Sequence, residues 1–434
     1  MKLYLTRRWY PEEKPHAKSE MVPVNNDPVK VRDMKKIFAL LMTFWMVALF
    51  ASAAIAAKSV VAIVKATPED GKLLDGKFHI RDLPAIAHTS EYAESEGDYT
   101  RAIWDLGSEE VWYRYIKQAT DLAGGIPVEK GETVLIKPNF VVAYFTMKDQ
   151  KYGDDTSIQG AFTDPRACLA VARICREMGA GRIIIGESPA RGDAWSAFMC
   201  YGLVYNQKRY AEMGIPYELV DFDENWEMMP GLGLGLKQYP IPKILREVQC
   251  LVNIGAFKTH GFAGVTVALK NLGIGLPSTR VIGANKFGLP HNKLAEVIVD
   301  VNSIAQKLVP KQMHISDAVY SGTWGPAAPY FYTGLILAGK DPVAVDAIGT
   351  ACMNLNPRTI GTTRLAAQNG LGKMDYDEIE VVGTPLEEAI IQDYPRHPYK
   401  ARAYPWAPDS YGKVTNWDQY YRHPLYGVPD YPRW

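Results

Sequence analysis

Residues 250–273, CLVNIGAFKTHGFAGVTVALKNLG, decide how the fold is interpreted. The apolar run Cys250–Gly255 is typical of a buried strand. Several glycines, two lysines, a histidine and an asparagine follow it, namely Lys258, His260, Lys270 and Asn271. In open α/β sheets, ligands bind at the carboxyl ends of the strands. Because cationic donors stand beside glycines that let the backbone approach closely, this strand end is predicted to bind a small anion.

The segments around this stretch alternate between strand and helix patterns. Strands are predicted at residues 58–66, 133–136, 182–185, 217–220, 313–317 and 334–338. Helices are predicted at residues 109–122, 164–178, 242–248 and 291–308, and from residue 342 onward. Residues 67–107 are interpreted as an irregular surface excursion. The alternation indicates an α/β fold with a largely parallel sheet and flanking helices, which we expect to form two sub-domains around a cleft.

Composition excludes several classes of partner and cofactor. Lys and Arg together number 48, as do Asp and Glu, so the chain lacks the basic footprint of a nucleic-acid-binding protein. The 5 cysteines form no C-x-x-C pair, so there is no intrinsic iron–sulfur or zinc-ribbon motif, and most are expected to be small buried hydrophobes. Gly231–Gly235 lacks the third spaced glycine and the following helix of a dinucleotide-binding fingerprint, so NAD is not inferred.

The N-terminal region carries an export pattern. Residues 1–33 are polar and without periodicity, and are interpreted as a mis-start or a disordered tail. Residues 34–56 combine a basic start, an apolar run and the small-x-small sequence Ala54-Ile55-Ala56, which predicts a cleaved signal peptide. The mature protein would then be periplasmic or extracellular. The alternative is an uncleaved segment that anchors the chain in the membrane.

The C-terminal region differs in composition from the α/β domain expected over residues 57–392. Residues 393–434 interleave many Tyr and Trp residues with prolines. Proline at this density prevents regular helix, so this extension cannot build a core of its own. We expect its aromatic side chains to pack on the body of the protein or, alternatively, on a partner protein of the cell envelope.

Several motifs together resemble the family called domain of unknown function 362. They are Ile136-Lys137-Pro138-Asn139, Thr163-Asp164-Pro165, Gly186-Glu187-Ser188, Lys258–Gly261, Thr266–Asn271, His291, Asp317 with Gly325-Pro326, and Gly339–Asp346. Their order and spacing match over residues 59–369. The resemblance implies an α/β protein without a settled general activity. Many relatives carry a ferredoxin-type cysteine module, which this chain lacks.

A looser similarity connects the chain to the nickel-pincer lactate racemase family. It rests on His260-Gly261, Lys270 and His291. It implies a cleft between two α/β domains, lined by His and Lys, that binds a cofactor and a 2-hydroxy acid. The chain departs from that family at Val265-Thr266-Val267, where Ser and Gly are preferred, so we keep only the architecture and the anionic ligand.

Four residues are candidates for catalysis. Lys137 precedes a proline, which makes its backbone extended at a strand end. Lys258 and His260 are two residues apart and point the same way in an extended segment. Lys270 would share a helix face with Thr266 if that segment is helical, and a lysine in a dry cleft can serve as a base. The alternatives are solvated lysines and a capped structural histidine.

Other polar residues are predicted to bind the substrate or a metal ion. The expected substrate-binding residues are Asn139, Asn271, Glu187, Ser188 and Asp317. His260 and His291 are candidate ligands of a divalent metal, together with Glu187 and Asp317. Asp341 is expected to cap a helix instead.

These residues favour an enzyme that acts on a small, carboxylate-type anion by Lys/His acid–base chemistry. One alternative is a non-catalytic binding or assembly protein of the cell envelope that uses residues 393–434. Another is a redox accessory to an iron–sulfur partner. The sequence does not name the substrate, the cofactor or the reaction.

Overall fold

The computed structural model describes residues 42, 58–74, 106–141, 160–323 and 330–394. The expected signal peptide apart from Met42, the Gly325-Pro326 motif and all of the aromatic extension beyond Tyr394 lie outside the described residues. The described residues from Lys58 to Tyr394 belong to one compact unit. No helix among the described residues has both the length and the apolar character needed to cross a membrane.

One large sheet spans the described part of this unit. Its strands are β1 (Ser59–Lys65), β2 (Thr133–Lys137), β3 (Arg182–Glu187), β4 (Glu218–Asp221), β7 (Cys250–His260), β8 (Gly264–Thr266), β9 (Lys311–Thr323), β10 (Phe331–Gly339) and β11 (Ile379–Gly383). The order is β11-β1-β10-β9-β7-β2-β3-β4, and β8 pairs with β7. The pairings from β4 through β9 are parallel, as is that of β1 with β11. The sheet is therefore largely parallel, as predicted, with β10 and β8 antiparallel to their neighbours.

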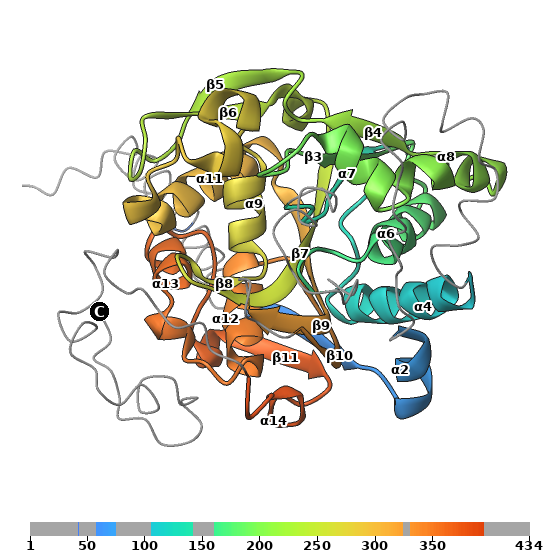
Figure 1. The fold of residues 1–434 in the computed structure, drawn as a ribbon. Helices are drawn as coiled ribbons and strands as arrows, with labels where there is room; N and C mark the ends of the chain where they lie inside the picture. Colours follow the sequence, from blue (N-terminus) through green and yellow to red (C-terminus); the bar gives the residue numbers. More distant parts are fainter. Residues whose placement is uncertain (1–41, 43–57, 75–105, 142–159, 324–329, 395–434) are drawn as a thin grey trace, which may run out of the picture. The chain divides into compact units, whose positions relative to one another are not determined.

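Helices cover both faces of this sheet. They are α2 (Pro68–Leu74), α4 (Leu106–Leu122), α6 (Pro165–Glu177), α7 (Ala194–Cys200), α8 (Leu203–Glu212), α9 (Leu269–Gly275), α10 (Thr279–Ile282), α11 (Leu294–Leu308), α12 (Pro342–Cys352), α13 (Gly361–Gln368) and α14 (Leu386–Ala389). Short 3-10 turns are η3 (Lys243–Arg246), η4 (Ala284–Lys286), η5 (His291–Lys293), η6 (Pro357–Thr359) and η7 (Tyr376–Glu378). Figure 1 shows α4 and α6 on one side of the sheet and α9, α11 and α12 on the other.

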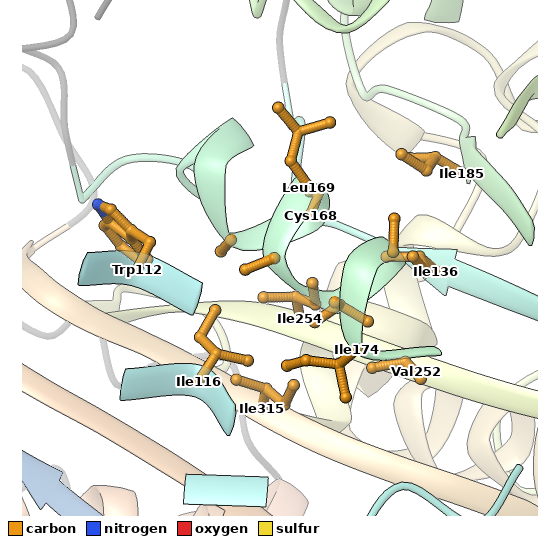
Figure 2. Packing of buried hydrophobic residues seen from close by; sticks show 14 of the residues in the cluster. Trp112, Ile116, Ile136, Cys168, Leu169, Ile174, Ile185, Val252, Ile254 and Ile315 are labelled. Atoms are coloured by element: carbon orange, nitrogen blue, oxygen red, sulfur yellow. The ribbon is translucent and has the colours of Figure 1, made fainter. Parts of the chain in front are cut away.

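Alternation along the central strands explains the two packed faces. Val134 and Ile136 of β2 join the core with α4 and α6, whereas Leu135 between them joins the core with α11. Trp112, Ile136, Ile174 and Ile254 meet in the first of these cores (Figure 2). Each aliphatic side chain that is fully buried in this way contributes about 1.5–3 kcal/mol. The sheet is thus fixed from both sides, and its strand ends become rigid supports for polar groups.

Most predicted elements are confirmed, with small shifts at their ends. Asp164 caps α6 through the backbone N–H of Arg166, and Asp341 caps α12 through the N–H groups of Val343 and Ala344. Cys168, Cys175, Cys250 and Cys352 are free and buried, as expected for small apolar residues.

Several predicted boundaries are wrong. The strand expected at 250–255 continues to His260, because β8 folds back and pairs with residues 258–260. The strand expected at 313–317 runs on to Thr323, so Asp317 lies inside β9 instead of at its end. Residues 68–74 form α2 where we expected irregular structure, and residues 243–246 form only a 3-10 turn. The hairpin of β5 (Trp226–Pro230) and β6 (Gln238–Pro242) was not predicted.

Candidate functional site

The candidate site lies at the carboxyl edge of the sheet, meaning the ends of β2, β3 and β7 and the segments that follow them. Lys137 ends β2 and Glu187 ends the neighbouring β3. The Lys137 Nζ donates to Glu187 Oε1 at 2.7 Å and to the Pro138 carbonyl oxygen at 2.7 Å. Both side chains are almost completely buried, at 1% and 2% exposure. Burial lowers the pKa of Lys137, and the adjacent Glu187 carboxylate opposes that shift.

Glu187 also organises the backbone around this pair. Its Oε1 accepts from the backbone N–H of Ser188 at 2.9 Å, and its Oε2 accepts from the N–H of Phe140 at 2.8 Å. The carboxylate is thereby satisfied on both oxygens. Lys137 packs tightly against Gly275 of α9, where an added Cβ would lie 2.4 Å from the Lys137 Nζ. A side chain at residue 275 would therefore displace the buried ammonium group.

A small cavity of about 30 Å³ opens beside this pair. Its polar lining comes from the predicted residues Lys137, Asn139, Glu187, Ser188, Lys270 and Asn271, and from Lys286, which was not predicted. The volume is enough for about one or two water-sized groups, such as the oxygens of one carboxylate. The structure therefore brings together six of the predicted site residues. Lys258, His260, His291 and Asp317 do not line the cavity.

Lys270 differs from the other lysines of the cavity, because its ammonium group has no partner among the described residues. It follows the first residue of α9, and its side chain is only 9% exposed. Within the described residues, no hydrogen bond or ion pair engages its ammonium group. Burial and the nearby Lys137 charge lower the pKa of Lys270 to about 8. An anion entering the cavity would supply the missing counter-charge.

Asp346 of α12 holds the beginning of α9 in place. Its Oδ1 accepts from the backbone N–H groups of Ala268 at 2.7 Å and Leu269 at 3.0 Å. Burial raises the pKa of this carboxyl to about 7. The helix has no cap from its own N-terminal residue, so α12 supplies one across space. Our expectation that Lys270 shares a helix face with Thr266 is wrong, because Thr266 belongs to β8.

Asn271 serves as a connector between strands. Its Nδ2 donates to the Asn253 Oδ1 at 2.7 Å and lies within 3.1–3.3 Å of the carbonyl oxygens of Lys137, Pro138 and Ile254. Asn139 is different, because in the described part of the chain only its backbone is engaged: its N–H donates to Thr163 Oγ1 at 2.8 Å, and its carbonyl accepts from the N–H of Thr163. Its side-chain amide remains available to a ligand in the cavity.

Lys286 enters the site from a segment that crosses the ends of β3 and β4. Its Nζ donates to Ser188 Oγ at 2.8 Å and to the Pro277 carbonyl at 2.6 Å. Ser188 Oγ donates in turn to Asp223 Oδ1 at 2.9 Å. Burial lowers the pKa of Lys286 to about 7, although the Asp223 charge opposes the shift.

The backbone at this point is unusual. Asn285 and Lys286 have φ values of 57° and 56°, in the left-handed region that non-glycine residues occupy at a cost of about 1–3 kcal/mol. The backbone N–H of Asn285 donates to the Ala190 carbonyl at 2.6 Å, and its side chain accepts from Arg191. Sequence reasoning missed Lys286 because it lies outside any strand end. The Asn-Lys pair within a glycine-flanked loop was the available signal.

Lys258 and His260 are not part of the cavity lining. The Lys258 Nζ donates to the Ala161 carbonyl, and burial together with the Lys270 charge lowers its pKa well below the ordinary value. His260 Nδ1 accepts from the backbone N–H groups of Phe262 at 3.2 Å and Ala263 at 3.4 Å, which stabilises the turn between β7 and β8.

The two predicted metal-binding histidines, His260 and His291, share Phe262 as an aromatic neighbour. The ring of Phe262 lies 6.2 Å from that of His260 and 5.6 Å from that of His291 between centroids. His291 Nδ1 lies 2.9 Å from the Leu289 carbonyl. In the described part of the chain, no three His, Cys, Asp or Glu side chains are grouped as a metal ion would require. A metal at His260 and His291 therefore stays a prediction.

Asp317 occupies a different place from the one expected. It lies within β9 and accepts from the backbone N–H of Asp164 at 2.7 Å, at the start of α6. Burial and the Asp164 charge raise its pKa to about 7. Asp164 itself binds Arg166 at 2.6 Å. Asp317 therefore positions α6, which packs beneath the strands that carry Lys137 and Glu187.

Comparisons with known proteins found one distant curated relative and two solved structures of low similarity. The thylakoid-associated protein sll1697 of Synechocystis sp. is 24% identical over 248 residues, which cover 56% of this chain and 70% of that protein. A solved structure from Thermotoga maritima has a TM-score of 0.30 at 13% identity, and covers 60% of this chain. The lactate racemase apoprotein from Thermoanaerobacterium thermosaccharolyticum has a TM-score of 0.27 at 14% identity, and covers 51% of this chain.

This chain spans 59% and 52% of the lengths of those two solved structures. The family model described as Domain of unknown function (DUF362) matches residues 134–351, which include the strand ends of Lys137 and Glu187, all of α9, and Lys286. The chain belongs to the domain of unknown function 362 family.

Proposed function

We propose that the chain is an enzyme that binds a small carboxylate in the cavity beside Lys137 and transfers a proton through Lys270. The observation that carries this proposal is the buried Lys270 ammonium, which lines the cavity without a partner among the described residues. A pKa near 8 lets the same group act as cation or base close to neutral pH. The engaged Lys137–Glu187 pair supplies a fixed frame for the ligand.

The ligand would be held by groups that the fold leaves available. A carboxylate can accept from Lys270 and from the Asn139 amide, both of which line the cavity. Charge-assisted hydrogen bonds of this kind are roughly twice as strong as neutral ones. Because the cavity is small, we expect it to receive the acidic end of a ligand. His260 would contribute from the adjoining turn and not from the cavity wall.

A binding experiment tests this proposal. Acetate and inorganic phosphate are titrated into the full chain and into the variants Lys270→Met and His260→Ala, with calorimetric detection. We expect acetate to bind the unmodified chain, and Lys270→Met to weaken that binding about tenfold or more, because one charged hydrogen bond contributes about 1.5–3 kcal/mol. His260→Ala should have a smaller effect.

Lys117→Met is the matched control, because Lys117 lies on α4 and pairs with Asp121 at the surface. Equal acetate affinity in the unmodified chain and in Lys270→Met would refute the proposed role of Lys270. Failure of both anions to bind the unmodified chain would refute the site itself.

We further propose that the protein is exported. The support is the signal-like pattern of residues 34–56. Expression in a bacterium with an intact secretion system, followed by N-terminal sequencing of the periplasmic fraction, should show a chain that begins near Ala57. An uncut chain in the cytosol would contradict export, and an uncut chain in the membrane fraction would support the anchor instead.

A further inference from the structure

Four lysine ammonium groups are buried at the carboxyl edge, and three of them are bound to neighbours. Lys137 donates to Glu187, Lys258 donates to the Ala161 carbonyl, and Lys286 donates to Ser188. In the described part of the chain, Lys270 alone of the four has no such bond. A lysine with no acceptor has nothing that favours its protonated form in a buried place.

The charges around Lys270 act in the same direction. Lys137 on β2 and Lys258 on β7 both repel its positive form. The carboxylate that lines the described cavity, that of Glu187, is already bound to the Lys137 Nζ at 2.7 Å. An amine that is desolvated beside other cations keeps its lone pair at lower pH than an exposed lysine does, which is the condition for a nucleophilic lysine.

The other groups of the cavity fit the acidic part of a carbonyl compound. Lys137 and Lys286 present positive charge, and Asn139 presents an amide whose side chain is not engaged elsewhere among the described residues. Together they suit a carboxylate. A carbonyl carbon directly attached to that carboxylate would then lie beside Lys270. The compound class with these two groups adjacent is the 2-oxo acids.

We propose that Lys270 is a nucleophile that forms an imine with the carbonyl carbon of a 2-oxo acid bound in this cavity. This inference rests on the proposed carboxylate site. The Nζ lone pair forms the carbon–nitrogen bond, and the carbon–oxygen bond breaks. The oxygen leaves as water, with one proton from the amine and one taken up from the solvent. The product is a positively charged iminium on Lys270, and no electrons enter or leave the system.

Reductive trapping tests the imine directly. The full chain is incubated near pH 8 with pyruvate and sodium cyanoborohydride, digested, and mapped by mass spectrometry. We expect one pyruvate-derived label per chain, on Lys270, in roughly tenfold or greater excess over any exposed lysine, because far more of Lys270 is neutral at that pH. Excess acetate should suppress the label, since it occupies the carboxylate position without a carbonyl group.

Lys286 is the matched comparator, because it is as deeply buried but bound to Ser188 and Pro277. Lys270→Arg keeps the charge without a nucleophilic amine and should lose the label. If that variant does not fold, the position of the label in the unmodified chain still decides the outcome.

Three results separate the two proposals. Pyruvate that binds calorimetrically but leaves Lys270 unlabelled overturns the imine and leaves the carboxylate site standing. A label spread equally over Lys270, Lys286 and the surface also overturns the imine. If neither pyruvate nor acetate binds, the site proposed above fails, and the imine fails with it.

Discussion

The buried lysine charges near β3 and those near β7, on the two sides of the carboxyl edge, are compensated differently. On the β3 side, Lys137 has Glu187 and Lys286 has Ser188, which is bound to Asp223. On the β7 side, Lys270 and Lys258 repel each other, and no carboxylate among the described residues binds Lys270. A buried charge without a counter-ion costs several kcal/mol. The buried lysines of the β3 side are therefore compensated by the protein itself, whereas on the β7 side the ligand proposed above would supply the counter-charge for Lys270.

Breaking the buried Lys137–Glu187 pair on the β3 side should give the largest loss of stability. Replacement Glu187→Ala leaves the Lys137 ammonium buried and uncompensated, and it frees the N–H groups of Ser188 and Phe140. We expect the free energy of unfolding to fall by about 3–5 kcal/mol, as for other broken buried pairs. Urea denaturation followed by circular dichroism measures it.

The control for this change is Asp121→Ala, which breaks a pair of similar length, 2.6 Å, on the exposed surface of α4. It should cost about 0.5 kcal/mol or less. Similar losses of stability in the two variants would contradict the view that the buried Lys137–Glu187 pair contributes more than the exposed Lys117–Asp121 pair.

On the β7 side, Lys270 should make the free energy of unfolding of the ligand-free protein depend on pH. Because the pKa of Lys270 is lowered to about 8, the unfolded chain binds more protons than the folded chain between about pH 8 and pH 10.4. The free energy of unfolding of the ligand-free protein should therefore rise with pH across this window, by up to about 3 kcal/mol. Lys286, with a pKa of about 7, adds a rise of the same sign from a lower pH.

The replacement Lys270→Met sharpens this comparison. It should remove the Lys270 part of the rise and make the ligand-free protein more stable near pH 7 by roughly 1–3 kcal/mol, since an unpaired buried charge is replaced by an apolar group.

Between about pH 4 and pH 7 the raised pKa values of Asp317 and Asp346 act oppositely, and the free energy of unfolding should fall as pH rises. Denaturation curves from pH 4 to pH 10.5 test both windows; parallel profiles in the two proteins would contradict the assignment to Lys270.

The general fold could be predicted because its strands carry strong local signals. Leu135 and Ile136 or Ile183–Ile185 are short apolar runs, and each is followed by a polar strand end that the structure places in one region. The capping residues Asp164 and Asp341 were likewise recognisable, since an Asp before a proline favours a helix start. These features depend only on neighbouring residues.

The errors come from interactions across space. The extension of β7 to His260 depends on pairing with β8, and the extension of β9 depends on β10. Asp346 of α12 accepts from the backbone at the start of α9 across separations of 78 and 77 residues. Lys286 reaches the cavity only because two residues adopt left-handed backbone conformations. No local pattern of spacing predicts such contacts.

The pairing of β1 also sets an order for folding during synthesis. Val61 pairs with Gly339 on one side and with Val381 on the other, so the first described strand has no neighbour until nearly the whole domain has been made. Such long-range pairings close large loops and form slowly. A chain emerging from its N-terminus therefore carries Ser59–Lys65 as an unpaired apolar segment for most of its synthesis, so the complete sheet cannot form until nearly the whole domain has emerged.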